Sequence, residues 1–220
     1  MEIITQPNAD KAAEYLAELI NTKLAAGQRV LWLVPGGSAI KIAANTSKRL
    51  NQPLNNLTVT LTDERHGRVG HKDSNWPQLQ AAGLHLPGAT MQPVLLGKNL
   101  ILTTKDYSQM LQTYIKNTDY SLALAGMGPD GHIFGIKPGS PAIDTNQTVV
   151  GYDWEDYVRI TPTPKFIKQL DEVVVYAVGQ EKWPQFESLK KNLDPSEQPA
   201  QLLKQLKKAI IFSDYKGDRL

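Results

Sequence analysis

The feature that most constrains the fold of this chain is a regular alternation between short apolar runs and segments with helical spacing. The runs read as buried strands, and several are rich in β-branched residues. They occupy residues 29–34, 57–62, 119–125, 172–178 and 209–212. Because parallel strands need crossover connections, which are usually helices, the alternation predicts a mainly parallel sheet covered by helices on both faces.

Helical patterns fill most of the intervals between these runs. The first begins at Asn8, a residue type that caps helices, and ends before Gly27. Further helices are expected from Ile40 to Leu50, from Ser74-Asn75 through Leu84, over 103–115, over 164–170, after Gly179 and over 199–207. Two more short strands are expected at 91–96 and 148–152, whereas the rest of 140–155 has no clear pattern.

Length and composition predict a single α/β domain that comprises residues 1–220. A chain of 220 residues with 41% hydrophobic and 21% charged residues can bury one sizeable core, and no repeat or linker-like segment divides it. The 24 basic and 22 acidic side chains give a net charge of +2, and the basic residues are mostly dispersed. This argues against a nucleic-acid or membrane partner but not against a small anionic ligand.

The sequence carries no sign of targeting or of an oxidising compartment. It has no cysteine, which excludes disulfides, thiolate nucleophiles and cysteine metal sites. The first residues lack a basic segment followed by an apolar one, and no apolar run approaches the length that spans a membrane. We therefore expect a cytoplasmic protein.

A glycine-rich turn follows the strand predicted at 119–125. Three glycines within 126–131 allow backbone angles that other residues disfavour, and the turn carries Asp130 and His132 two residues apart. A strand that ends in glycines and then presents a carboxylate and an imidazole is typical of a site at the carboxyl edge of a parallel sheet. The alternative is a tight turn whose Asp and His are ordinary surface residues.

Polar turns also follow two earlier strands. After the first come Gly36, Gly37 and Ser38, whose backbone N–H groups and hydroxyl suit an anion at the N-terminus of the next helix. An ordinary turn with Ser38 as the helix cap would have the same sequence. After the second come Asp63 and Arg65 among other charged residues, which indicate either a site or a solvated loop with charge pairs.

Five motifs in a fixed order connect these turns. They are Pro35-Gly-Gly-Ser38, Asp63-Glu-Arg65 with His71 and Ser74-Asn75 downstream, Gly126-Met-Gly-Pro-Asp-Gly-His132, Arg159-Ile-Thr161 and Gly179-Gln-Glu-Lys182. In these motifs the chain resembles 6-phosphogluconolactonases over nearly its whole length; the wider superfamily includes glucosamine-6-phosphate deaminases. The resemblance implies a Rossmann-like three-layer α/β fold.

The resemblance also implies an activity. An enzyme of this kind hydrolyses 6-phosphogluconolactone in the pentose phosphate pathway, without a metal or a nucleotide or other cofactor. Its partner would be a small phosphosugar lactone. The oligomeric state is left open between a monomer and a small homo-oligomer.

Within this resemblance, His132 is the expected general base. Lactone hydrolysis needs a water activated near neutral pH and stabilisation of the negative charge that develops on the carbonyl oxygen. An imidazole suits the first task, and His132 resembles the residue proposed for it in the lactonases. Asp130 or Asp63 would orient His132 or raise its basicity, and the sequence does not distinguish between them.

The other polar residues of the motifs would bind the substrate. The loop from Gly36 to Ser38 would hold the 6-phosphate, and Arg65 would hold the phosphate or the developing oxyanion. Arg159 and Lys182 resemble family positions that neutralise the same phosphate, although each alone would pass for an exposed charge at the end of a strand or helix. Asn75 would either hydrogen-bond a sugar hydroxyl or cap a helix.

The segment after His132 departs from both branches of the superfamily. It reads Ile133-Phe-Gly-Ile-Lys-Pro-Gly-Ser140, and Lys137 stands where deaminases carry a glutamate that assists the catalytic histidine. This charge reversal favours hydrolysis over deamination. In the phosphate loop, Ala39-Ile40 replaces the Thr-Pro of the lactonases. A deaminase or isomerase and a non-catalytic sugar-phosphate-binding protein are the alternatives.

Overall fold

A seven-stranded parallel sheet lies at the centre of the structure, a computed structural model that describes residues 1–5 and 8–217. Its strands are β1 (Glu2–Ile4), β2 (Val30–Val34), β3 (Leu57–Leu61), β5 (Thr90–Met91), β6 (Tyr120–Gly126), β9 (Glu172–Ala177) and β10 (Ala209–Ser213). They pair in the order β1-β10-β9-β6-β2-β3-β5, and all neighbours are parallel. The prediction of a mainly parallel sheet is confirmed.

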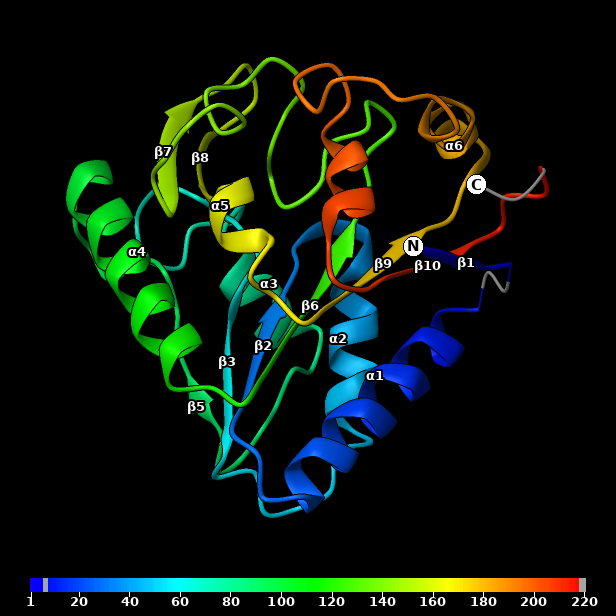
Figure 1. The fold of residues 1–220 in the computed structure, drawn as a ribbon. Helices are drawn as coiled ribbons and strands as arrows, with labels where there is room; N and C mark the ends of the chain where they lie inside the picture. The colour runs from blue at the N-terminus through cyan, green and yellow to red at the C-terminus, as the bar shows by residue number, and fades with distance from the viewer. Residues whose placement is uncertain (6–7, 218–220) are drawn as a thin grey trace.

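Helices cover both faces of this sheet. They are α1 (Ala9–Ala25), α2 (Ile40–Ser47), α3 (Asn75–Ala81), α4 (Leu100–Lys116), α5 (Pro164–Ile167) and α6 (Trp183–Leu189), with 3-10 segments η1 (Gly37–Ala39), η2 (Gln180–Lys182) and η3 (Pro199–Gln205). Figure 1 shows α1 and α2 together on one side of the sheet and α4 on the other. In the described part of the chain, no helix is both long and apolar enough to cross a membrane.

A second, antiparallel sheet of three strands was not expected from the sequence. It consists of β4 (Glu64–Arg65), β7 (Val149–Asp153) and β8 (Val158–Pro162), paired in the order β4-β8-β7. In Figure 1, β7 and β8 lie at the top of the view, on the side toward which the β6 arrow points. Only β7 was anticipated, as a short strand at 148–152.

The strands form where the sequence concentrates apolar side chains. All five residues of β2 are buried, and Trp32 at its centre has no exposed surface. The start of α1 is also as predicted, because the Asn8 side chain accepts a hydrogen bond from the Asp10 N–H at 2.8 Å. Gly27 follows the helix with a φ of +73°, a conformation that favours glycine.

Two expected elements are wrong in extent or type. The strand expected at 91–96 is only β5, which pairs with β3 through Thr90 and Met91. Pro93, two residues after Met91, has no N–H for a continued ladder. The helix expected at 199–207 is the 3-10 segment η3. The sequence also missed β1, a strand of three residues whose ladder is with β10 at the far end of the chain.

The strand order places several loops at one edge of the sheet. From β2 the chain builds β3 and β5 in one direction, and it then returns to add β6 on the other side of β2, followed by β9. In parallel sheets, ligands bind outside the carboxyl ends of the strands where this direction changes. The loops after β2, β3, β6 and β9 all leave the sheet at this edge.

Candidate active site

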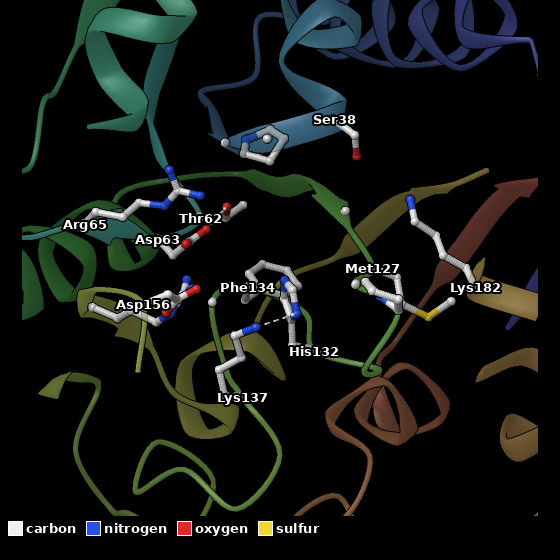
Figure 2. Close-up of a pocket in the computed structure, with 18 of the residues that line it drawn as sticks. Ser38, Thr62, Asp63, Arg65, Met127, His132, Phe134, Lys137, Asp156 and Lys182 are labelled. Carbon is white, nitrogen blue, oxygen red and sulfur yellow. Dashed lines mark hydrogen bonds and ion pairs between the residues drawn. The ribbon is translucent and has the colours of Figure 1, made fainter. Parts of the chain in front are cut away.

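A cavity of about 410 Å³ lies at this edge of the sheet (Figure 2). Residues from the loops after β2, β3, β6 and β9, together with residues before and within β8, line it. Eight of the ten residues expected from the sequence line this cavity: Gly36, Gly37, Ser38, Asp63, Arg65, His132, Arg159 and Lys182. The other two, Asp130 and Asn75, lie behind it and contact residues that line it.

His132 is held by a carboxylate two residues before it. Its Nδ1 lies 2.5 Å from Asp130 Oδ1, and the same oxygen accepts a hydrogen bond from the His132 backbone N–H at 3.2 Å. We assign the ring proton to Nδ1, because an ionised carboxylate can only accept. The lone pair of the neutral ring is then on Nε2. Of the two carboxylates that the sequence left open, Asp130 is the one hydrogen bonded to His132.

The glycine turn leaves little room for the imidazole to move. The Gly128 N–H donates to the His132 carbonyl at 3.0 Å, and a Cβ atom at Gly128 would lie 2.2 Å from His132 Nδ1. Gly131 has a φ of +81°, in the left-handed region. The glycines of the motif therefore serve both the turn and the close approach of the histidine ring.

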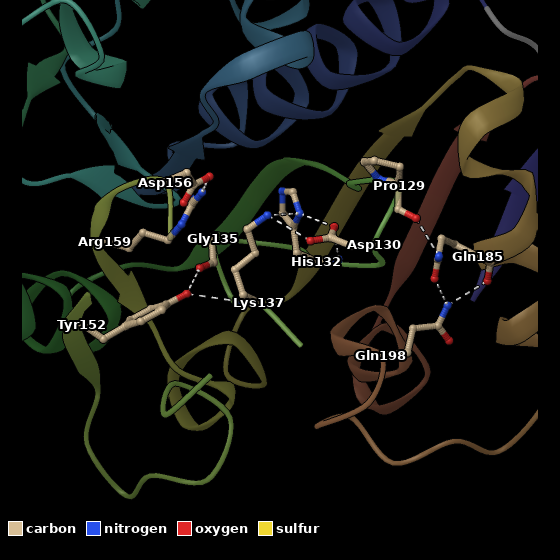
Figure 3. Close-up of polar contacts among 10 residues, drawn as sticks. All are labelled: Pro129, Asp130, His132, Gly135, Lys137, Tyr152, Asp156, Arg159, Gln185 and Gln198. Carbon is tan, nitrogen blue, oxygen red and sulfur yellow. Dashed lines mark hydrogen bonds and ion pairs between the residues drawn. The ribbon is translucent and has the colours of Figure 1, made fainter. Parts of the chain in front are cut away.

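Lys137 reaches the same carboxylate from the other side (Figure 3). Its Nζ donates to Asp130 Oδ2 at 2.9 Å and lies 3.3 Å from His132 Nδ1. Partial burial opposes ionisation of Asp130, but the hydrogen bonds and charges of His132 and Lys137 outweigh it and lower the pKa of the carboxyl below its usual range. Asp130 is therefore an anion shared by two neighbours.

Asp63 occupies a different wall of the cavity. Its Oδ1 accepts a hydrogen bond from the Thr62 hydroxyl at 2.9 Å, and its side chain packs against Gly135, where a Cβ atom would lie 2.7 Å away. The structure shows no hydrogen bond from Asp63 to His132 within residues 1–5 and 8–217. Asp63 therefore lines the cavity without contacting the imidazole by a hydrogen bond.

The phosphate loop expected at Gly36 to Ser38 is packed against Asn75. The Asn75 side chain is fully buried, donates to the Asp63 carbonyl at 2.8 Å, and fills the space that a Cβ at Gly36 would need. Gly37 has a φ of +65° and begins η1, which leads into α2. Asn75 is the first residue of α3 and makes no cap, so its placement braces the loop from behind.

Two arginines lie side by side at one end of the cavity. The β4–β8 register sets Arg65 opposite Arg159, and their guanidinium carbons lie 4.9 and 5.6 Å from the centroid of the Tyr157 ring. Arg65 donates to the Asp73 carbonyl at 2.9 Å, and Arg159 donates to Asp156 at 2.6 Å. Within the described residues, the buried Nε of each arginine has no hydrogen-bond partner. Two guanidinium groups this close repel each other, so this end of the cavity favours an anion.

Lys182 supplies a separate cation from η2. Its residue is only 7% exposed, and its Nζ makes no hydrogen bond or ion pair within the described part of the chain. Burial lowers the pKa of Lys182, although the charges of Glu181 and Asp214 oppose the shift. A buried ammonium without a partner is a favourable position for an anionic ligand, which would stabilise the charged form.

These cations occupy two ends of the cavity. In Figure 2, Ser38 and Lys182 lie on one side of His132, whereas Arg65 and Asp156 lie on the other. Arg159 belongs to the second end through its hydrogen bond to Asp156. The sequence led us to expect Arg159 and Lys182 around one phosphate; the structure distributes them on opposite sides of the imidazole.

Glu64 supports the site from a fully buried position that the sequence did not single out. Its carboxylate accepts hydrogen bonds from the Ser74 hydroxyl and the Asn75 N–H, both at 2.8 Å, and from the Arg65 N–H at 2.7 Å. Burial raises the pKa of Glu64, although these hydrogen bonds oppose the shift. The carboxylate thus holds the start of α3 against β4. Its partners lie ten and eleven residues later in the chain, and no local sequence pattern links residues that far apart.

Gln185 is a second support that sequence reasoning missed. From α6, its Nε2 donates to the Pro129 carbonyl at 2.7 Å, and its own carbonyl groups accept from Gln198 at 2.9 Å (Figure 3). These contacts brace the turn that carries His132. No motif or periodicity marks Gln185, so no sequence signal would have found it. No three histidine or acidic side chains of the described residues come together as a metal site would require.

Comparison with known proteins shows the family of this chain. Residues 5–212 match the family described as glucosamine-6-phosphate isomerases/6-phosphogluconolactonase. A rice protein (Oryza sativa subsp. indica), named probable 6-phosphogluconolactonase 4, chloroplastic, is 31% identical over 174 residues. That match covers 69% of this chain and 51% of the rice protein, so the chain spans about half the length of this relative.

Other proteins match over most of their length. The 6-phosphogluconolactonase of Caulobacter vibrioides is 24% identical over 209 residues, which are 89% of this chain and 88% of that protein. The crystal structure of a 6-phosphogluconolactonase from Shewanella baltica has the same fold, with a TM-score of 0.79, 20% identity and 96% of each chain covered. The chain therefore belongs to the family of glucosamine-6-phosphate isomerases and 6-phosphogluconolactonases.

Proposed function

We propose that this chain hydrolyses 6-phospho-D-glucono-1,5-lactone to 6-phosphogluconate, a reaction of the pentose phosphate pathway. The observation that carries the proposal is His132, whose Nδ1 is bound to Asp130 and whose ring lines a cavity with cations at both ends. A neutral imidazole with a free Nε2 is a suitable base at working pH. The names of the relatives support the same activity.

In this reaction His132 would act first as a base and then as an acid. Nε2 takes a proton from water, and the water oxygen attacks the lactone carbonyl carbon to form a tetrahedral oxyanion. When the carbonyl re-forms, the ester bond to the ring oxygen breaks, and the ring oxygen receives the proton from His132. Asp130 stabilises the imidazolium that exists between the two transfers.

The two cationic ends suit the two anionic groups of the product. A 6-phosphate would lie against the η1 loop, with Ser38 and Lys182 as its partners. The carbonyl carbon would then be near His132, and the developing oxyanion or the product carboxylate would face Arg65 and Arg159. In this assignment, each cationic side chain binds the anionic group that lies on the same side of the imidazole.

Lys137 supports hydrolysis over deamination. Lys137 stands where the deaminases that this chain resembles carry a glutamate that assists the histidine, and its ammonium lies 3.3 Å from His132 Nδ1. A positive charge there also disfavours a substrate that carries a protonated amine.

The experiment that tests the proposal is a comparison of two substrates. Freshly generated lactone is incubated with low enzyme concentrations, and acid release is measured against the spontaneous rate; ammonia release from glucosamine 6-phosphate is measured in parallel. We expect acid release in proportion to enzyme, and no ammonia. Ammonia release would identify a deaminase. Thermal stabilisation by 6-phosphogluconate without turnover of either substrate would identify a binding protein.

A further inference from the structure

Lys137 is a charged residue beside the imidazole that the proposed reaction steps do not use. Its side chain is only 14% exposed, and its Nζ lies between the Asp130 carboxylate and the His132 ring. At this distance the charge of the ammonium must affect the protonation of the His132 ring. Lys137 therefore has an effect on the imidazole whatever ligand the cavity binds.

The backbone around Lys137 is built to place it there. Phe134 and Gly135 have φ values of 53° and 72°, and these left-handed residues turn the chain back toward the glycine turn. The Thr161 hydroxyl donates to the Phe134 carbonyl. The Tyr152 hydroxyl donates to the Gly135 carbonyl at 2.5 Å and accepts from the Lys137 N–H at 3.3 Å (Figure 3). Side chains from β7 and β8 thus fix the residues on which the position of Lys137 depends.

We propose that Lys137 is a positioning residue that acts on His132 through Asp130, holding the carboxylate in place and keeping the ring neutral before it accepts a proton. The inference rests on the proposed function, because it treats His132 as a base. Asp130 alone favours the imidazolium, since a carboxylate stabilises a nearby positive charge. The ammonium opposes this by sharing the carboxylate and by repelling a second positive charge at Nδ1.

The geometry also assigns the hydrogen bonds. An ammonium has donors only, and Nδ1 of the neutral ring donates its proton to Asp130, so Lys137 and His132 do not hydrogen-bond each other. They share one carboxylate, with His132 at Asp130 Oδ1 and Lys137 at Oδ2. Lys137 thereby directs Asp130 Oδ1 to the ring and keeps the Nε2 lone pair toward the cavity.

Other charged groups face the same space. Asp63 and Arg65 contribute from the loop after β3 and from β4, Asp156 and Arg159 from the β8 side, and Glu181 and Lys182 from η2. Asp130 hydrogen-bonds the His132 ring, and the Lys137 Nζ lies 3.3 Å from its Nδ1. Substitution of Lys137 therefore changes the charge nearest the imidazole and leaves these more distant groups in place.

The test measures His132 directly and through activity. Ring-proton NMR titrations and pH–rate profiles for lactone hydrolysis are recorded for the wild-type chain, Lys137→Met and Lys137→Arg. Lys168→Met, which removes an exposed lysine from the end of α5, is the matched control. We expect Lys137→Met to move both the half-protonation point of His132 and the acid limb of the rate profile to higher pH by about one unit, the scale of a nearby like charge. Lys137→Arg should restore both, and Lys168→Met should change neither.

The outcomes separate the two proposals. A His132 titration that is unchanged or moves to lower pH in Lys137→Met would overturn the role of Lys137. A uniform loss of rate at all pH values, or a change in KM alone, would do the same, because it would indicate a structural or ligand-contact role. If the wild-type chain does not hydrolyse the lactone, the proposed function fails, whereas the NMR comparison still decides whether Lys137 controls His132.

Discussion

Gly128 controls where the imidazole of His132 can lie. A methyl group at this position would come within 2.2 Å of Nδ1 and 2.5 Å of Asp130 Oδ1, so Gly128→Ala must disturb the contact between the ring and the carboxylate. Because a misplacement of about 1 Å can cost on the order of 10²-fold in rate, we expect kcat to fall by about that factor while the fold is retained. Steady-state kinetics and circular dichroism measure the two.

A glycine two residues earlier provides the comparison. A Cβ at Gly126 would meet its nearest neighbour, Ser38 Oγ, at 3.9 Å, which is ordinary contact. Gly126→Ala should therefore lose much less activity than Gly128→Ala. Equal losses in the two variants would show that the position of the imidazole is not what limits the rate.

Substitution of Lys182 separates the contribution of the phosphate to binding from that of the rest of the ligand. Replacing it with Met removes the ammonium that we assign to the 6-phosphate, so the affinity for 6-phosphogluconate should fall by about 10–100-fold, the range for a charged hydrogen bond. The affinity for gluconate, which lacks the phosphate, should hardly change. Calorimetric titration measures both, and equal losses would place the phosphate elsewhere.

The same variant has an expected effect on the free protein. Burial lowers the pKa of Lys182 in the folded state, so below that pKa the folded chain bears a cost for keeping the side chain charged. Lys182→Met removes this cost and should leave the unliganded protein at least as stable as the wild type. Urea unfolding at neutral pH tests this, and a marked loss of stability would contradict it.

The loops that form the site were predictable because each follows an apolar strand. The burial of β2 and β6 is evident from their composition. Because the carboxyl ends of parallel strands share one edge of a sheet, the sequence was sufficient to predict that Ser38 and His132 lie at the same edge. The antiparallel sheet was not predictable in this way. β4 has only two residues, and the five residues of β8 lead almost directly into the proline-started helix α5, so neither was recognised as a strand.

That missed sheet determines which residues become neighbours. The β4–β8 register sets Arg65 opposite Arg159, and Tyr152 of β7 holds the backbone at Lys137. The separation of Arg159 from Lys182 follows from the same sheet, since one belongs to β8 and the other to the loop after β9. Residue types at the site could therefore be read from the sequence, whereas their division between two ends could not.

At the opposite edge of the central sheet, Asp119 clamps the beginnings of β2 and β6. Its Oδ2 accepts from the Arg29 backbone N–H at 2.8 Å and from Nε at 3.0 Å, and its Oδ1 accepts from Nη2 at 2.9 Å. The hydrogen bonds from Arg29 lower the pKa of Asp119 from its ordinary 3.8 to about 2. A lowered folded-state pKa means that the contribution to stability is present above the ordinary value and is lost as pH falls toward about 2.

Asp119→Asn should therefore be less stable than the wild type at neutral pH, and the difference should shrink as the pH approaches 2. The urea midpoint of both proteins, measured over this range, gives the difference. Asp144→Asn, which alters an exposed carboxylate, serves as the control and should show no such trend. A difference that is constant with pH would show that the ionised form of Asp119 is not what stabilises the strands.

At the scale of the whole molecule, the fold determines where the site lies but not which reaction it catalyses. The family includes both isomerases and lactonases, so the parallel sheet and its loops are compatible with either. Under the proposed function, the choice between the two reactions depends on side chains beyond β6, where Asp130 and Lys137 contact or approach the imidazole. The alternation of strands and helices predicted the sheet from sequence alone; the return of residues 133–140 onto the glycine turn depends on long-range contacts that no local pattern contains.

The most direct test of the account is the rate at which His132→Ala hydrolyses fresh 6-phosphogluconolactone, compared with the wild type at equal, low enzyme concentration. We predict a fall of about 10²–10⁴-fold, the usual contribution of a general base, with binding of 6-phosphogluconate largely retained. His85→Ala, which removes an exposed histidine outside the cavity, should keep the wild-type rate. A His132→Ala variant that hydrolyses the lactone at the wild-type rate would contradict the account.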